Sequence, residues 1–217
     1  MMKFFFSSIG QKIQIAFTGL SLAIFLLFHL FNNLVLFTGS ENFNKMVNFL
    51  KSIHLFVRVL EIGLLLIVLI HVINAIATSI QNRKANNGKY AIEANTAPKS
   101  SKTMIWSGMI ILFFFIIHLR YYWYTFQNMA KDADFFNVML KNEFGFLGHT
   151  PTAIFYIIAI LLIASHLKHG FTSVFKTIGI PFKYRDSIVK YLSFIFWAII
   201  PFGFIVVVMY IQYLANQ

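Results

Sequence analysis

The chain has 217 residues, of which 59% are hydrophobic and only 12% are charged, and its mean hydropathy is +0.73. These values exclude an ordinary soluble domain and indicate a polytopic membrane protein. The formal net charge is +11 and there is no cysteine. Disulfides, thiolate-bound clusters, cysteine nucleophiles and covalent haem attachment are therefore all excluded.

Five apolar stretches are long enough to cross about 30 Å of hydrocarbon as helices. We therefore expect an all-α bundle of five transmembrane helices that forms one domain over residues 1–217. Residues 1–10 hold one lysine and show no small-residue cleavage site after a short apolar core, so we expect the first helix to stay in the mature protein. The predicted helices lie near 13–37, 56–80, 104–126, 153–175 and 188–214.

The basic residues are divided unequally between the two ends of this bundle. Twelve of the 18 lysines and arginines fall on the side of the N-terminus, together with only two of the seven acids. Cytoplasmic segments of membrane proteins are enriched in cations, so we place the N-terminus in the cytoplasm. The asymmetry explains the net charge without nucleic acid. It either sets topology alone or also offers a basic surface to a cytoplasmic partner.

Histidine is the residue that points to a function. His29 lies deep in the first apolar stretch, and His71, His118 and His166 lie within the next three. A neutral imidazole in hydrocarbon needs partners for its ring nitrogens, so four on successive membrane helices are costly to keep without a use. Imidazole is a common axial ligand of haem iron, and four imidazoles can make two bis-histidine sites.

Helix direction predicts how the histidines pair. The first and third helices run outward, and His29 and His118 lie past their midpoints. The second and fourth run inward, and His71 and His166 lie past theirs. We therefore pair His29 with His118 near the outer side and His71 with His166 near the cytoplasmic side. The residue offsets put the two levels about 10 Å apart.

The fourth ligand has an alternative. His169 follows His166 by three residues, about 60° round the helix, and could replace it as ligand. We favour His166 because it is deeper, which leaves His169 near the headgroups where it could contact a haem propionate. His54 and His149 fall in the outer connections and are expected to be solvated.

Haem propionates require cations or hydroxyls near the membrane surface. Lys168, Ser173 and Arg83 on the inner side could supply them. Glu61 opens the second helix at the outer surface, ten residues before His71. It could transfer protons to and from a bound quinone, or it could simply pair with Arg58 three residues earlier.

Several local motifs accompany the four histidines. They are Phe28 and His29 followed by 39–44, 58–61 ahead of Ile70 and His71, Asn82 and Arg83 with 88–90, and 166–171 with Ser173 and Gly179. In these residues the chain resembles, over nearly its whole length, the diheme cytochrome b membrane anchor of succinate dehydrogenase and fumarate reductase, in its single-polypeptide five-helix bacterial type. The resemblance implies that His29 and His118 hold the distal haem and His71 and His166 the proximal haem.

The same resemblance implies the partners and the reaction. A flavoprotein and an iron–sulfur subunit are expected on the cytoplasmic face, and electrons from succinate oxidation are expected to reach a quinone, menaquinone in the relatives of this type, near the distal haem. The protein would lie in the bacterial cytoplasmic membrane. Two alternatives stay open: a diheme quinol-oxidising anchor of another respiratory enzyme, and a haem-free permease whose histidines relay protons.

Overall fold

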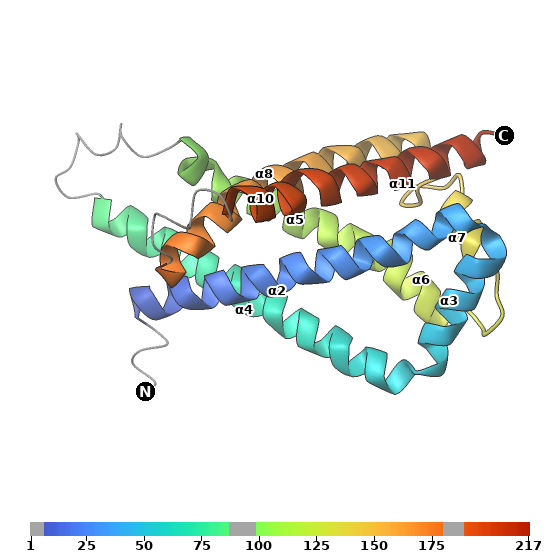
Figure 1. Ribbon diagram of the computed structural model, residues 1–217, viewed down its shortest axis with the longest axis horizontal. Coiled ribbons are helices and arrows are strands. Elements are labelled where there is room, and N and C mark those ends of the chain that lie inside the picture. The colour runs from blue at the N-terminus through green and yellow to red at the C-terminus, as the bar shows by residue number, and fades with distance from the viewer. Residues whose placement is uncertain (1–6, 87–98, 180–188) are drawn as a thin grey trace.

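The computed structural model describes residues 7–86, 99–179 and 189–217, and the described chain contains helices and no strands. Five helical stretches are long and apolar enough to cross a membrane, so the predicted all-α fold with five spans is confirmed (Figure 1). The predicted limits of the spans agree with the observed limits to within five residues. Position 188, the predicted start of the fifth span, lies outside the described residues. The spans are Ser8–Thr38, His54–Asn82, Met104–Asn128, Thr150–Ile178 and Lys190–Ala215.

Several of the spans are built from consecutive helical segments. The first joins α2 (Ser8–Leu34) to the 3-10 turn η1 (Val35–Thr38), and α4 (His54–Asn86) forms the second. The fourth is α8 (Thr150–Ile178). The third span consists of α5 (Lys99–His118), the π-helical turn η3 (Leu119–Trp123) and α6 (Tyr124–Asn128). The fifth span consists of α10 (Lys190–Phe194), the π-helical turn η5 (Ile195–Ile199) and α11 (Ile200–Ala215).

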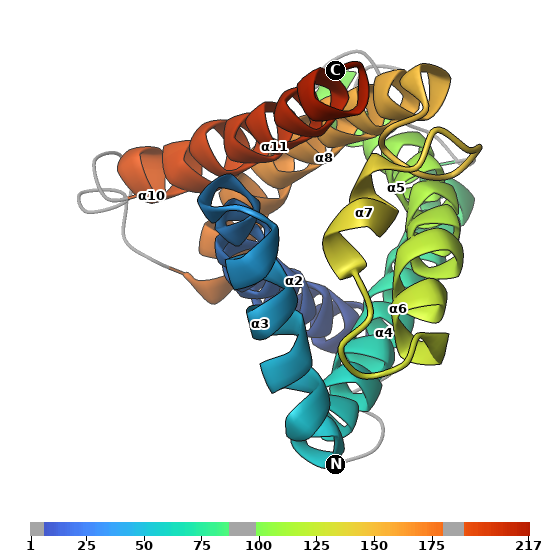
Figure 2. The ribbon, with the colours of Figure 1, turned by 90° about the vertical axis from the view of Figure 1, so that its right-hand side faces the viewer.

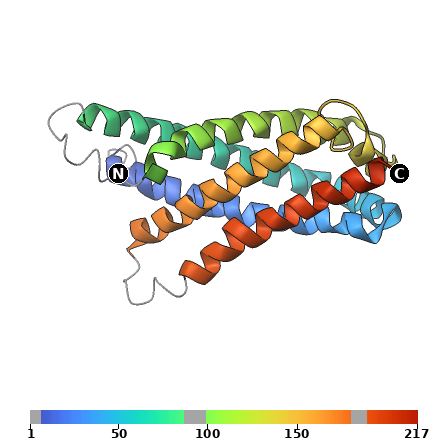
Figure 3. The same ribbon diagram turned by 90° about the horizontal axis from the view of Figure 1, so that it is seen from above.

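The five spans lie roughly along one long axis and alternate in direction (Figures 1 and 3). Helix α2 packs against α4, α8 and α11, and α8 packs against α5 and α11. The start of α2, the end of α4 and the start of α10 lie at one end of the bundle, which we call the N-terminal end. The other end, which we call the distal end, carries the C-terminus.

A helical cap covers the distal end, where the sequence analysis expected only connections between spans. It consists of α3 (Ser40–Ser52) and α7 (Phe135–Leu140) (Figure 2). The Asn44 side chain joins them, because its Nδ2 donates to Asp134 and its Oδ1 accepts from the Phe136 backbone N–H. A cluster of buried apolar residues surrounds the fully buried Phe135 here and extends into the fourth and fifth spans.

Local sequence explains where helices end and where they loosen. Pro151 lies in the first turn of α8, where a missing N–H costs nothing, and Gly179 closes the helix in the left-handed conformation with φ of 78°. Pro201 opens α11 directly after η5. Because proline cannot donate to the carbonyl four residues earlier, the wider π turn is a way for the preceding helix to accommodate it.

Candidate functional site: two histidine pairs

The structure brings the four intramembrane histidines together as two pairs. The ring centres of His29 and His118 lie 5.7 Å apart, and those of His71 and His166 lie 6.4 Å apart. Each pair joins helices that are distant in sequence. All four residues are only half-buried, although they lie in the middle of long apolar helices. These are the pairs that helix direction predicts.

Hydroxyl groups set the orientation of the rings in the pair His71 and His166. The Thr18 hydroxyl lies 3.0 Å from Nδ1 of His71, and the Ser107 hydroxyl lies 3.4 Å from Nδ1 of His166. Both hydroxyls already donate to carbonyls of their own helices, Thr18 to Gln14 at 2.6 Å and Ser107 to Met104 at 3.0 Å. They therefore accept the Nδ1–H of each histidine, which leaves the Nε2 lone pair available to a metal.

Aromatic side chains surround the pair His29 and His118. The Tyr156 hydroxyl lies 3.4 Å from Nδ1 of His118, and the Tyr122 ring lies 5.6 Å from the His118 ring. The His29 ring stacks on Phe25, with a centre distance of 5.4 Å, and also contacts Phe204. Tyr122 belongs to the π-helical turn η3, which begins directly after His118.

Three helices each serve both pairs. Helix α2 supplies His29 to one pair and Thr18 to the other, eleven residues apart, and α5 does the same with His118 and Ser107. On α8 the spacing between His166 and Tyr156 is ten residues. At 1.5 Å per residue, the two levels are about 16 Å apart along the helices. The expected separation of about 10 Å was therefore too short, because it ignored which residues of neighbouring helices meet.

Glycine permits close approach to both rings of the pair nearer the N-terminal end. A Cβ added to Gly19 would lie 3.2 Å from Cε1 of His71, and one added to Gly108 would lie 3.6 Å from Cε1 of His166. By contrast, a Cβ at Gly63 or Gly170 would meet nothing within 4 Å. Sequence reasoning missed Thr18, Ser107, Tyr156 and these glycine contacts. The repeated spacing of ten or eleven residues between a hydroxyl and a histidine was the available signal.

The geometry suits a metal ion held from two opposite sides. Two imidazoles that each bind one metal at about 2 Å have ring centres about 6 Å apart, which matches both pairs. Within the described chain, no group of three His, Cys, Asp or Glu residues could hold a metal ion. A metal here would thus need further ligands of its own, as a porphyrin provides. No residue in the most apolar stretch of the second or third span is buried, so both spans leave side-chain surface that a flat macrocycle could cover.

Glu61 lies in a polar cluster near the distal end. Its Oε2 accepts from Nη1 of Arg58 at 2.7 Å, and its Oε1 accepts from Nε1 of Trp123 at 2.9 Å and from Nε2 of Gln127 at 3.2 Å. Arg58 also donates to Gln127. The pairing of Glu61 with Arg58 that the sequence suggested is therefore present, and the cluster joins α4 to η3 and α6. Trp123 follows His118 by five residues.

The other candidate residues are placed as follows. The Lys168 ammonium lies 4.6 Å from the centre of the Trp197 ring. Ser173 is exposed and His169 is half-buried, both on the last turns of α8. The Arg83 side chain lies outside the described residues. His54 opens α4, and His149 precedes α8 with its Nδ1 2.9 Å from the Thr152 hydroxyl.

Comparison with known proteins adds no assignment, because no family model, curated protein or solved structure matches the chain. The functional argument therefore depends on the residues and on their geometry.

Proposed function

We propose that this protein is a membrane-bound cytochrome b with two haems, one between His29 and His118 and one between His71 and His166. The observation that carries the proposal is the ring separation in each pair, 5.7 and 6.4 Å, which fits two imidazoles on opposite sides of one iron. The contacts of Nδ1 in His71 and His166 with hydroxyls support it, because metal-binding histidines usually donate the other N–H to a neighbour.

Bound haem would supply one-electron chemistry at each of the two levels. The part of the chain itself is structural and electrostatic. The four imidazoles provide the ligands, while Thr18 and Ser107 fix two of the rings. The length of the helix between Thr18 and His29 keeps the levels about 16 Å apart, which is about half the thickness of the hydrocarbon layer.

Within this class, we infer that the protein is the membrane anchor of a succinate:quinone oxidoreductase in a bacterial cytoplasmic membrane. The sequence resemblance described above supports this choice, and so does the basic N-terminal end, which suits docking of an iron–sulfur subunit and a flavoprotein. Electrons from succinate would enter at that end and reduce a quinone, menaquinone in this proposal, toward the distal end. The partners would carry out the succinate chemistry.

Glu61 is our candidate for proton exchange with the quinone. Its carboxylate lies beside Trp123, an indole that is 41% exposed, and Trp123 follows the ligand His118 by five residues. A proton-transferring group must be within hydrogen-bond reach of the atom it serves. Glu61 would therefore have to release at least one of its three present donors and take up a proton before it could donate to a quinone oxygen.

We assign the propionates of the haem between His71 and His166, which we call the inner haem, to its side nearer the N-terminal end of the bundle. In this proposal Ser173, seven residues after His166 and on the same side of α8, and His169 are the nearest candidates, with Arg83 on α4. Lys168 is less suited than expected, because it follows His166 by two residues and so projects from the opposite side of α8.

Reduced-minus-oxidised spectroscopy of the purified chain, combined with a haem assay per polypeptide, tests the cytochrome assignment. We expect b-type bands and two haems per chain, whereas a haem-free permease would give neither. Co-purification from the native membrane tests the partner. Recovery of a flavoprotein with succinate:quinone reductase activity is the expected result, and recovery of a different respiratory enzyme would contradict the assignment to succinate oxidation.

A further inference from the structure

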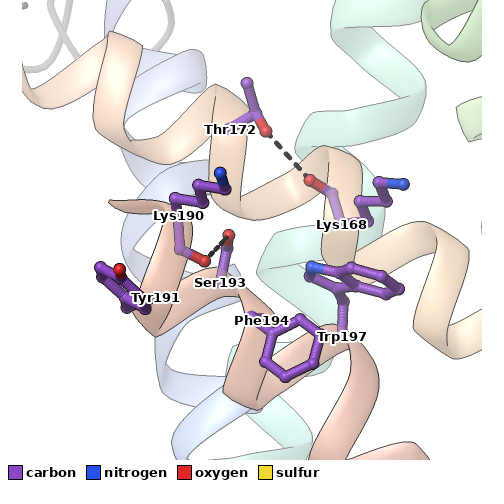
Figure 4. A pocket seen from close by; sticks show the side chains of 7 residues that line it. All are labelled: Lys168, Thr172, Lys190, Tyr191, Ser193, Phe194 and Trp197. Carbon is purple, nitrogen blue, oxygen red and sulfur yellow. Dashed lines mark hydrogen bonds between the residues drawn. The ribbon is translucent and has the colours of Figure 1, made fainter. Parts of the chain in front are cut away.

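A second site lies at the N-terminal end of the bundle, between α8 and the last span. It is an open pocket of about 450 Å³. Lys168 and Thr172 line it from α8, and Lys190, Ser193, Phe194 and Trp197 line it from α10 and η5 (Figure 4). Thr172 follows Lys168 by four residues, which places both on one face of α8. On the last span, Ser193, Phe194 and Trp197 follow Lys190 by three, four and seven residues, and so also share one helix face. The sequence analysis did not anticipate this site.

Charge distinguishes this pocket from an ordinary gap between helices. Two lysines line it, and neither α8 nor the described part of the last span contains an aspartate or glutamate. The ion pairs found in the described residues, Lys45 with Glu41 and Arg58 with Glu61, both lie toward the distal end. Among the described residues the pocket is therefore positive, and no described carboxylate forms an ion pair with its lysines, so an anion could bind there.

The depth of the two lysines in the membrane indicates which kind of anion could bind. Lys190 is the first residue of the last span, which at 26 residues is long enough to cross a hydrocarbon layer of about 30 Å, so Lys190 lies near the edge of the apolar layer. Lys168 lines the same pocket from a deeper position, four residues past the middle of the 29-residue α8, where an ammonium is costly without a partner. Its contact with the Trp197 ring offsets part of this cost.

The apolar lining shows where the rest of the ligand would lie. Phe194 and Trp197 follow Lys190 by four and seven residues, so they lie about 6 and 10 Å deeper along the helix axis. Phe194 is 49% exposed and Tyr191, at the rim, is 72% exposed. Cations at the surface with aromatic rings below them are the arrangement that suits a phospholipid, whose phosphate is shallow and whose acyl chains are deep.

We propose that this pocket binds one anionic phospholipid, with its phosphate between Lys168 and Lys190 and its acyl chains along Phe194 and Trp197. The site is independent of the haem proposal, since it lies on the side of α8 away from His166. Binding would fix the start of the last span against α8.

The test uses the full-length chain, purified and reconstituted in nanodiscs that contain phosphatidylcholine with a minor fraction of phosphatidylglycerol of the same acyl composition. Lipid retained after detergent extraction is counted by native mass spectrometry. We expect one retained phosphatidylglycerol, and a loss of affinity of about fivefold for Lys168→Gln or Lys190→Gln and about thirtyfold for the double variant. Trp197→Ala should also weaken retention, because it removes the surface for the chains.

Lys176→Gln is the matched control, because Lys176 is also an exposed lysine of α8 but does not line the pocket. It should retain the lipid as the unmodified chain does. Lys168→Arg keeps the positive charge and should retain the lipid. This variant separates the effect of the charge from a folding defect in Lys168→Gln. Equal retention of phosphatidylcholine, displacement of the lipid by inorganic phosphate, or equal loss in Lys176→Gln would overturn the proposal.

Discussion

The Thr18 hydroxyl accepts the Nδ1–H of His71 across 3.0 Å, although the two residues are 53 positions apart in the chain. This contact fixes the tautomer of a ring that lies within the apolar span formed by α4. The centre of this ring lies 6.4 Å from that of His166.

Removing the Thr18 hydroxyl should change the redox potential of the haem proposed between His71 and His166, the inner site. A hydrogen bond from Nδ1–H makes the imidazole a stronger electron donor, which favours oxidised iron. We therefore expect Thr18→Val, which keeps the shape of the side chain, to raise the midpoint potential of one haem by about 20–60 mV, the equivalent of a hydrogen bond of about 1 kcal/mol. Redox titration followed at the b-type band measures the shift. Thr18→Ser should leave the potential close to its original value, and unchanged potentials in Thr18→Val would contradict the role of the hydroxyl.

Gly19 should be required for the inner site alone. A Cβ added to Gly19 would lie 3.2 Å from Cε1 of His71, so the branched side chain of Gly19→Val should push the ring aside. We expect this variant to contain about one haem per chain and to keep the outer one. Gly63→Val is the control because it introduces the same side chain in an apolar helix with nothing within 4 Å of the new Cβ. Loss of haem in both variants would point to a general defect in helix packing instead.

The fourth ligand can be decided by two substitutions. His71 faces His166, with 6.4 Å between ring centres. We therefore expect His166→Ala to lose the inner haem and His169→Ala to retain both haems, with at most a shift in potential from a changed propionate contact. The haem content of each purified variant gives the answer. The reverse pattern would show that His169 is the ligand and that α8 is rotated from the position described.

The Arg58 and Glu61 ion pair allows stability and proton transfer to be separated. Glu61→Gln and Arg58→Gln each remove the same 2.7 Å ion pair, whose side chains are 26% and 41% exposed. Each should cost about 1 kcal/mol and lower the melting temperature by about 2–4 °C. Only Glu61→Gln removes the acid, so only this variant should slow quinone reduction strongly. Equal turnover in the two variants would leave Glu61 a purely structural role.

The sequence by itself determined the class of the protein and the number of its spans. Apolar stretches of more than 20 residues can only be helices in hydrocarbon, because no water is present to satisfy the backbone. Alternating direction then places His29 with His118 and His71 with His166, since residues past the midpoint of antiparallel neighbours fall at matched heights. These inferences require only helix rise and direction.

Only the tertiary structure decided which side chains meet at those heights. The rotation and tilt of each helix are set by its packing partners, so the contacts of Thr18 with His71, Ser107 with His166 and Tyr156 with His118 could not be predicted from periodicity. The same reason explains the separation of about 16 Å in place of 10 Å. The pocket between Lys168 and Lys190 likewise depends on the packing of α10 and η5 against α8, which no local pattern in the sequence specifies.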